Sequence, residues 1–283
     1  MKFYTFVPVV FKKIWGQEIW LLSGNSIVNS IAYRKNNEEI TTLKAIMKQE
    51  DFPLIIKIIT PIKDLSIQVH PNDTYAQKEE KCLGKDEFWY ILNDAQNMKI
   101  INGHKAPNRA EFLRYLNSNK LESILNCISV KRNDCVQITA GTVHSLKKDV
   151  KVLEIQENSD ITYRIFDYKR MYNGAYRKLD LYHGLEAIVY PSIHKNIIRG
   201  PFFNTCKKKV LEKNKHYTII YYNLSQTYNQ VLELKFFSVF YILEGGGYFE
   251  DARVEKGMCF LITPTEQKCK ISGKDLKFLL IYV

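Results

Sequence analysis

A short stretch of the chain, residues 66–73 (SIQVHPND), alternates polar and apolar side chains and then breaks at a proline. Because alternate residues of a strand point to the same face, Gln68 and His70 share one face, and Ile67 and Val69 share the other. Both polar side chains carry atoms that can bind a metal ion or a substrate. The alternation by itself leaves open whether the polar face meets water, as on an edge strand, or points inward.

Two further candidate ligands lie in other parts of the sequence. Glu87 opens the aromatic run EFWYIL, and a carboxylate there needs a partner if it is buried. His144 follows Gly141 and Thr142 at the entrance of a predicted strand. Nitrogen and oxygen ligands from separate strands suit Zn²⁺ or a similar divalent ion, with one position left for water or substrate. On spacing alone, each histidine could also be an ordinary surface or core residue, and Glu87 a solvated strand end.

Several charged residues stand where a soluble β protein seldom places them. Glu154 and Arg164 flank the segment IQENSD, and an inward-facing Arg164 would need an anion such as phosphate or an enediolate. Lys57 interrupts the apolar run FPLIIKII, either as an edge residue whose ammonium reaches water or as an inward ammonium that faces a ligand. Lys85 shares a strand face with Glu87.

Strand signals dominate the chain, so strands must position most of these side chains. Short runs rich in β-branched and aromatic residues are bounded by Pro, Gly, Asn or Asp, as is typical of strands. They cover residues 52–60, 65–70, 87–92, 135–140, 150–156 and 161–168 in the first half, and 216–224, 236–243, 247–257, 258–263 and 276–283 in the second. This succession predicts a mainly β protein built as a sandwich or barrel.

Helices are the minority. Asn108 is a plausible N-cap with Glu111 three residues later, and apolar residues at helical spacing follow as far as Leu125. This pattern predicts a small helical insertion around residues 108–128. Residues 39–48 and 181–192 are weaker helix candidates.

The two halves of the chain share a strand rhythm that indicates tandem jelly-roll modules. The segment "VKRNDCVQITAGTVHSL" resembles "VEKGMCFLITPTEQKCK", in which Thr265-Glu266-Gln267 replaces Val143-His144-Ser145. We therefore expect residues 1–190 to form a metal-binding domain that contains the helical insertion. Residues 191–283 should form a C-terminal domain that lacks the metal site.

The composition excludes some classes of protein and leaves others open. The 283 residues are 46% hydrophobic, which is typical of globular proteins, and no apolar run approaches the length of a membrane span. Pro8 interrupts the apolar N-terminal stretch and no cleavage site follows, so a cytoplasmic location is expected. The six cysteines form no CxxC pair and should be reduced. The net charge of +11 would suit either nucleic acid or a phosphorylated small molecule.

Four motifs in order, "FPLIIKIITPIKDLSIQVHPND", "GKDEFWYIL", "AGTVHSL" and "LEIQENSDITYRIFDYKR", resemble those of short bacterial type I mannose-6-phosphate isomerases. The resemblance runs from about Trp15 to Arg170 and implies two cupin modules, the second matched more loosely. The segment after Trp15-Gly16 is shorter than is usual in the family, and no site residue is predicted between residues 17 and 35.

The resemblance also implies a role for each candidate residue. It makes Gln68, His70, Glu87 and His144 the ligands of one Zn²⁺ ion per chain. It places Arg164, Lys85 and Glu154 in the catalytic site, and Ser66 and Lys57 at the substrate. The expected enzyme interconverts mannose 6-phosphate and fructose 6-phosphate by moving a proton between C1 and C2 through a cis-enediol.

Two other functions remain to be weighed at this stage. A catalytically inactive cupin could bind a sugar phosphate as a sensor or accessory module, but every expected ligand is present. A cupin dioxygenase usually uses a histidine-rich site, which the Gln and Glu ligands disfavour. The expected partner is a phosphorylated hexose, with no nucleic acid or membrane, and the chain should be a monomer or homodimer.

Overall fold

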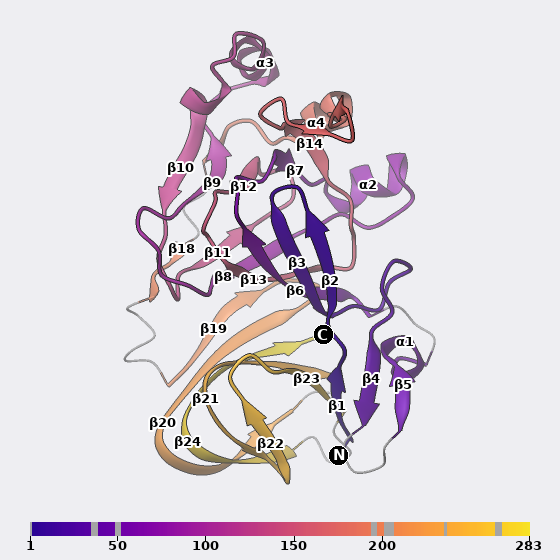
Figure 1. Cartoon of the computed structure of the whole chain (residues 1–283), viewed down its shortest axis with the longest axis vertical. Coiled ribbons are helices and arrows are strands. Elements are labelled where there is room, and N and C mark those ends of the chain that lie inside the picture. The colour runs from indigo at the N-terminus through magenta and orange to yellow at the C-terminus, as the bar shows by residue number, and fades with distance from the viewer. Residues whose placement is uncertain are drawn as a thin grey trace. The chain divides into compact units, whose positions relative to one another are not determined.

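The computed structural model describes residues 2–34, 39–48, 52–193, 197–200, 207–234, 237–263 and 268–283. These residues form two compact units (Figure 1). Unit 1 contains residues 1–9, 20–54 and 200–283, and unit 2 contains residues 10–19 and 55–199. Every candidate site residue lies in unit 2.

Two sheets build unit 2. The order in the first sheet is β18 (Ile197–Ile198), β11 (Cys135–Ile138), β8 (Glu87–Ile91), β13 (Val152–Glu157), β6 (Leu54–Pro61), β3 (Gly16–Leu22) and β2 (Val9–Lys13). The order in the second is β10 (Leu125–Ser129), β9 (Lys99–His104), β12 (His144–Leu146), β7 (Ile67–Val69) and β14 (Tyr163–Phe166), with β17 (Ser192–Ile193) beside β9. A small hairpin joins β15 (Met171–Tyr172) to β16 (Ala175–Tyr176).

The core of unit 2 lies between these two sheets. Trp89 and Val136 from the first sheet pack in one cluster with Ile100 and Leu146 from the second. Trp89 is almost fully buried, and burying a large apolar side chain contributes about 1.5–3 kcal/mol. The inward faces of both sheets therefore line one interior, as in a jelly roll.

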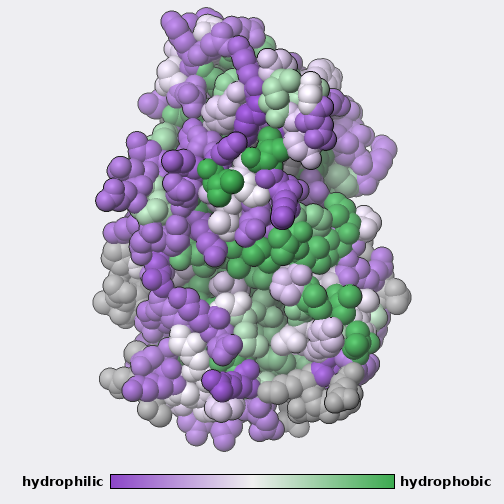
Figure 2. Space-filling view, in the orientation of Figure 1, coloured by the Kyte–Doolittle hydropathy of each residue, from purple (hydrophilic) through white to green (hydrophobic). Residues whose placement is uncertain are grey.

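The second sheet is covered on its outer face as well. Ile67 and Val69 are completely buried, in a cluster with Phe112 of α3 (Arg109–Asn117) and Leu185 of α4 (Leu181–Ala187). The surface around α3 and α4 is mostly hydrophilic (Figure 2). The apolar face of residues 66–70 thus packs outward against this layer, which leaves Gln68 and His70 to face the interior.

The helical insertion is shorter than predicted. Helix α3 ends at Asn117, a 3₁₀ turn covers Leu121–Ile124, and Leu125–Ser129 is strand β10, so the helical prediction was wrong for residues 125–128. The reason lies at Asn119, which adopts a left-handed φ of 57° and ends the helix. The backbone amide of Lys120 then donates to the carbonyl of Tyr115 across this turn.

The predicted N-cap of α3 is present and carries a stability prediction. The Oδ1 atom of Asn108 accepts a hydrogen bond from the backbone amide of Glu111 at 2.9 Å. Asn108→Ala should lower the free energy of unfolding by about 1 kcal/mol, because one amide of the first turn loses its partner. Urea unfolding followed by circular dichroism measures this change. Asn108→Asp keeps an acceptor and should stay near wild type; equal losses in both variants would contradict the capping role.

Unit 1 is also mainly β. Its sheet runs β19 (Lys208–Lys213), β20 (Thr218–Glu233), β24 (Lys268–Tyr282), β21 (Ser238–Phe249), β23 (Cys259–Thr263), β1 (Lys2–Phe6), β4 (Ile31–Arg34) and β5 (Ile40–Thr42), with β22 (Ala252–Glu255) beside β21. Stacked Phe240 and Phe260 lie in its core. The mainly β fold with few helices is therefore confirmed for both units.

The units divide the chain at more places than the predicted boundary near residue 190. N-terminal strand β1 pairs with C-terminal strand β23, because Phe3 and Tyr4 lie opposite Ile262 and Leu261. This pairing places the first residues of the chain in unit 1. The second module's missing histidine was predicted from residues 265–267, which lie outside the described residues.

The remaining helices are short. Residues 39–48 contain β5 and only one turn of helix, α1 (Leu43–Ile46), and α2 (Asp73–Glu79) follows the predicted turn at Pro71. Among the described residues, no helix combines the length and the apolar character needed to cross a membrane.

Candidate functional site

One row of side chains crosses the second sheet of unit 2. His144 lies opposite Gln68 on one side and opposite Asn102 on the other, and Gln68 lies opposite Arg164. Residues opposite one another in a sheet point to the same face. The pairing of β9, β12, β7 and β14 therefore brings residues that are 20 or more positions apart in the sequence into one line along the interior.

A buried cluster of three potential metal ligands includes His144 of this row. The Nε2 atom of His70 lies 3.0 Å from one carboxylate oxygen of Glu87, and the Nε2 atom of His144 lies 3.7 Å from the other. Their ligand atoms all lie within 4.8 Å of one another, and the three residues are at most 1% exposed. The predicted set is thus brought together from β8, from β12 and from the residue that follows β7.

The hydrogen bonds of the two imidazoles fit a shared cation. Each Nδ1 donates to a backbone carbonyl, that of Ile161 for His70 (2.8 Å) and that of Thr142 for His144 (2.9 Å). Both Nε2 atoms therefore present lone pairs, and they face carboxylate oxygens that also only accept. Burial and then Lys85 lower the pKa of His70 to about 3, so it stays neutral. The Nε2 atom of His70 and one oxygen of Glu87 have no hydrogen-bond partner among the described residues, and a divalent ion would satisfy them.

Gln68 lies at the edge of this cluster. Its Nε2 donates to the Nε2 of His144 at 3.2 Å, and its Oε1 accepts a hydrogen bond from Ser66 at 3.3 Å. A cation on the His144 lone pair would compete with the first of these bonds. Turning the amide would then point its oxygen toward the cation, which is the orientation a ligand requires.

Beside the cluster lies a pocket whose charged lining residues form pairs. The ammonium of Lys57 lies 2.9 Å from one oxygen of Glu154, and the indole of Trp89 donates to the other at 2.8 Å. The ammonium of Lys85 lies 3.0 Å from Glu87. All of these residues except Trp89 were predicted from the sequence, and all line the pocket. Of the two predicted orientations of Lys57, the ammonium points inward and does not reach water at a strand edge, since the residue is 4% exposed.

Burial and neighbouring charge shift the pKa values of the two glutamates in opposite directions. Burial raises the pKa of Glu154, and the nearby carboxylate of Glu87 raises it further, against the opposing effect of Lys57. Burial also acts to raise the pKa of Glu87, but neighbouring positive charge, chiefly the ammonium of Lys85 at 3.0 Å, holds that pKa well below its usual range. Glu87 is therefore the permanent anion of the pair, and Glu154 is the one that exchanges a proton more readily.

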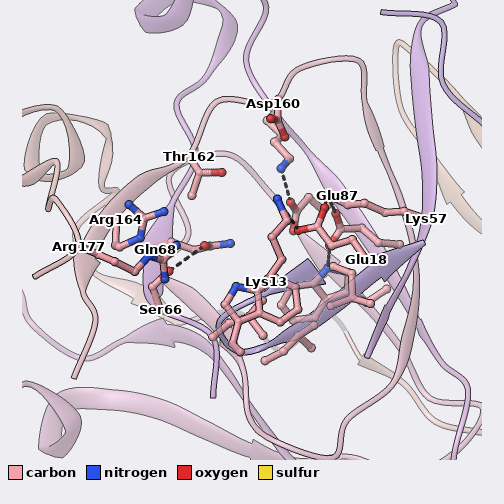
Figure 3. A pocket seen from close by; sticks show the side chains of 17 residues that line it. Lys13, Glu18, Lys57, Ser66, Gln68, Glu87, Asp160, Thr162, Arg164 and Arg177 are labelled. Carbon is pink, nitrogen blue, oxygen red and sulfur yellow. Dashed lines mark hydrogen bonds and ion pairs between the residues drawn. The ribbon is translucent and has the colours of Figure 1, made fainter. Parts of the chain in front are cut away.

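Two arginines gather at the opposite side of the pocket, beside Ser66 (Figure 3). We name Ser66, Arg164 and Arg177 the arginine end. Burial and then the charge of Arg177 lower the pKa of Arg164, as expected for two guanidinium groups that line the same end of the pocket. The Nε atom of Arg164 is buried without a hydrogen-bond partner among the described residues, while its Nη1 donates to the carbonyl of Lys178 at 3.0 Å. Two neighbouring cations with a spare donor suit an anion.

The residues that line the pocket but were not predicted from the sequence include Lys13, Glu18 and Arg177. Glu18 lies 4.0 Å from Lys57 and 3.9 Å from Lys13, and it belongs to the segment for which no site residue was predicted. A signal for Glu18 was present, because an acid in the strand GQEIWLL needs a partner if it is buried. No local pattern marked Arg177, which directly follows the two-residue strand β16.

Comparison with known proteins was made at the levels of sequence and structure. No family model matches the chain. YvyI of Bacillus subtilis, whose naming as a mannose-6-phosphate isomerase is provisional, is 35% identical over 243 residues, which cover 71% of this chain and 77% of YvyI. Mannose-6-phosphate isomerase ManA of the same organism is 34% identical over 215 residues, covering 66% of this chain and 68% of ManA.

A solved structure resembles the whole chain. The crystal structure of mannose 6-phosphate isomerase from B. subtilis superimposes with a TM-score of 0.87 at 25% identity, and it covers 100% of both chains. The likeness therefore extends over both units and is not limited to the motifs around the pocket.

Proposed function

This chain belongs to the type I mannose-6-phosphate isomerase family, whose reaction is an aldose–ketose isomerisation. On that premise we propose that the chain interconverts mannose 6-phosphate and fructose 6-phosphate, with Zn²⁺ bound in the pocket of unit 2. The observation that carries the proposal is the buried group of His70, Glu87 and His144 beside a pocket with two interacting arginines. The group of His70, Glu87 and His144 suits a divalent cation, and the two arginines suit a phosphate.

The phosphate of the substrate is assigned to the arginine end. Arg164 and Arg177 carry like charges that repel each other. A phosphate bound between them would offset this repulsion, because each guanidinium attracts its negative charge. The arginines can donate forked hydrogen bonds, and the hydroxyl of Ser66 adds a further donor. Lys57 also lines the pocket, but its ammonium is held by Glu154, so we assign it an indirect role in positioning that carboxylate.

The metal is assigned to His70, Glu87 and His144, with Gln68 as the fourth ligand. Imidazole and carboxylate ligands suit Zn²⁺, and the three buried side chains already lie with their ligand atoms within 4.8 Å of one another. When bound, Zn²⁺ would stabilise negative charge on the substrate oxygens at C1 and C2. The carboxylate of Glu87 is held ionised chiefly by Lys85, which keeps it ready to bind a cation.

Glu154 is assigned as the group that moves the proton between C1 and C2. A carboxylate with a raised pKa can accept a proton and return it, and its two hydrogen-bond donors fix its orientation. Lys85 and Arg164 supply positive charge near the cis-enediol, where negative charge develops on oxygen. Removal of the proton from C2 and its return to C1 by one carboxylate on one face of the enediol, together with the shift of a proton from the C2 hydroxyl to O1, would complete the isomerisation.

A coupled assay for fructose 6-phosphate tests the proposed function. Protein loaded with Zn²⁺ is expected to convert mannose 6-phosphate, a chelator should abolish turnover, and added Zn²⁺ should restore it, because the ligand atoms of His70 and Glu87 require a cation. Metal content is measured on the same samples. Fully loaded protein that binds mannose 6-phosphate without converting it would contradict the proposal and favour a non-catalytic sugar-phosphate-binding module.

A further inference from the structure

The buried carboxylate of Asp167 connects two arginines. One of its oxygens contacts Nη2 of Arg170, and the other lies 3.1 Å from Nη1 of Arg177. Asp167 is 4% exposed, whereas the side chains of the two arginines are 16% and 19% exposed. An aspartate this deeply buried holds its partners strongly, because an unpaired carboxylate at the same position would be costly.

The same cluster reaches the segment that contains Ser66. Arg170 uses its Nη1 to donate to the backbone carbonyl of Asp64, two residues before Ser66. Asp167 thereby holds Arg177 directly. Through Arg170, it is also connected to the backbone just before Ser66. Ser66 and Arg177 both line the arginine end of the pocket.

The backbone between Asp167 and Arg177 is shaped for this contact. Tyr168 and Lys169 both adopt left-handed φ angles, 53° and 51°, which non-glycine residues rarely do. This turn brings Arg170 back onto Asp167, and the hairpin of β15 and β16, closed by Asn173 and Gly174, returns the chain to Arg177. Unusual backbone conformations of this kind persist where the surrounding contacts require them, often beside functional sites.

We propose that Asp167 is a positioning residue that holds Arg177 in the pocket and so sets the affinity for the phosphate group of the substrate. The inference rests on the proposed function, since it assumes that the arginine end receives the phosphate. Asp167 and Asp180, whose carboxylate lies 3.9 Å from Nη1 of Arg164, carry two negative charges against the three positive charges of Arg164, Arg170 and Arg177, so the cluster keeps a net positive charge for an anion. Without this carboxylate, the guanidinium of Arg177 would be free to turn toward water.

Binding of inorganic phosphate and steady-state kinetics together test the proposal. In Asp167→Asn, calorimetry should show phosphate binding at least tenfold weaker, and the KM for mannose 6-phosphate should rise at least tenfold with kcat within about threefold of wild type. Arg177→Gln should lose phosphate affinity by a similar factor. Because Asp167 acts through Arg177, the double variant should be no worse than Arg177→Gln alone.

Two further variants separate positioning from a general structural effect. Asp167→Glu keeps the charge and should retain phosphate affinity within about threefold of wild type. Glu186→Gln removes the carboxylate of an exposed pair with Arg109 and should change neither measurement. If Asp167→Asn does not fold, as judged by circular dichroism, Asp167→Ser takes its place in the same cycle.

Wild-type phosphate affinity in Asp167→Asn, or losses that add in the double variant, would overturn the proposal. Phosphate binding does not require turnover. A wild-type chain without isomerase activity would therefore contradict the proposed function while leaving this test of Asp167 intact.

Discussion

His144→Ala is expected to yield protein that binds no stoichiometric Zn²⁺ and whose kcat/KM is lowered at least about 1,000-fold, since removing a metal ligand removes the charge that stabilises the reacting oxygens. His144 is completely buried, and its Nε2 lies 3.7 Å from Glu87 and 3.2 Å from the amide of Gln68. Alanine offers no ligand atom, and its methyl group does not fill the space of the imidazole. Metal content and the coupled assay on the same samples measure both effects.

His183→Gln is the matched control for this variant. His183 contacts Tyr75 and Tyr163 near α2 and α4 and lies outside the pocket, so its loss should leave both the metal content and kcat/KM near wild type. Circular dichroism excludes a loss of fold in either variant. His144→Ala protein that binds Zn²⁺ as tightly as wild type would show that the assigned ligand set is wrong.

Glu154→Gln is expected to lower kcat by a factor of about 10²–10⁴, the usual contribution of general acid–base catalysis, with a smaller change in KM. In the wild type, activity should fall as the pH drops through the raised pKa of Glu154, because the ionised carboxylate is the base. This acid limb should be absent in the variant. Exchange of deuterium from solvent into the substrate measures the proton transfer directly and should be lost with kcat.

Lys57 affects the stability of the Glu154→Gln variant, and its substitution also supplies the control. Lys57 is paired with Glu154 in the interior, and removing one partner of a buried ion pair typically costs about 3–5 kcal/mol. Lys57→Met combined with Glu154→Gln removes both charges, so it should regain stability without regaining activity. If Glu154→Gln still exchanges deuterium while Lys85→Met does not, Lys85 and not Glu154 carries the proton.

The sequence predicted those strands whose apolar residues alternate and whose ends carry turn residues, among them β6, β8, β13 and β21. The strands it did not predict include β9, whose sequence KIINGH is partly polar, and the short strands β4 and β5. Such short or polar strands are stabilised by pairing with their neighbours rather than by their own composition. The predicted helix continued past Asn117 because the apolar spacing did, whereas the left-handed turn at Asn119 decided its end.

The sequence by itself determined which side chains could bind a metal and a phosphate, since residue type and motif order are local properties. The pairing of β7, β12 and β14 decided that Gln68, His144 and Arg164 lie in one row. Partners in space likewise decided that Lys57 points inward and that Glu18 and Arg177 reach the pocket. Contacts between residues far apart in the chain depend on strand order and register, which no single segment encodes, and for this reason only the tertiary structure could assemble the site.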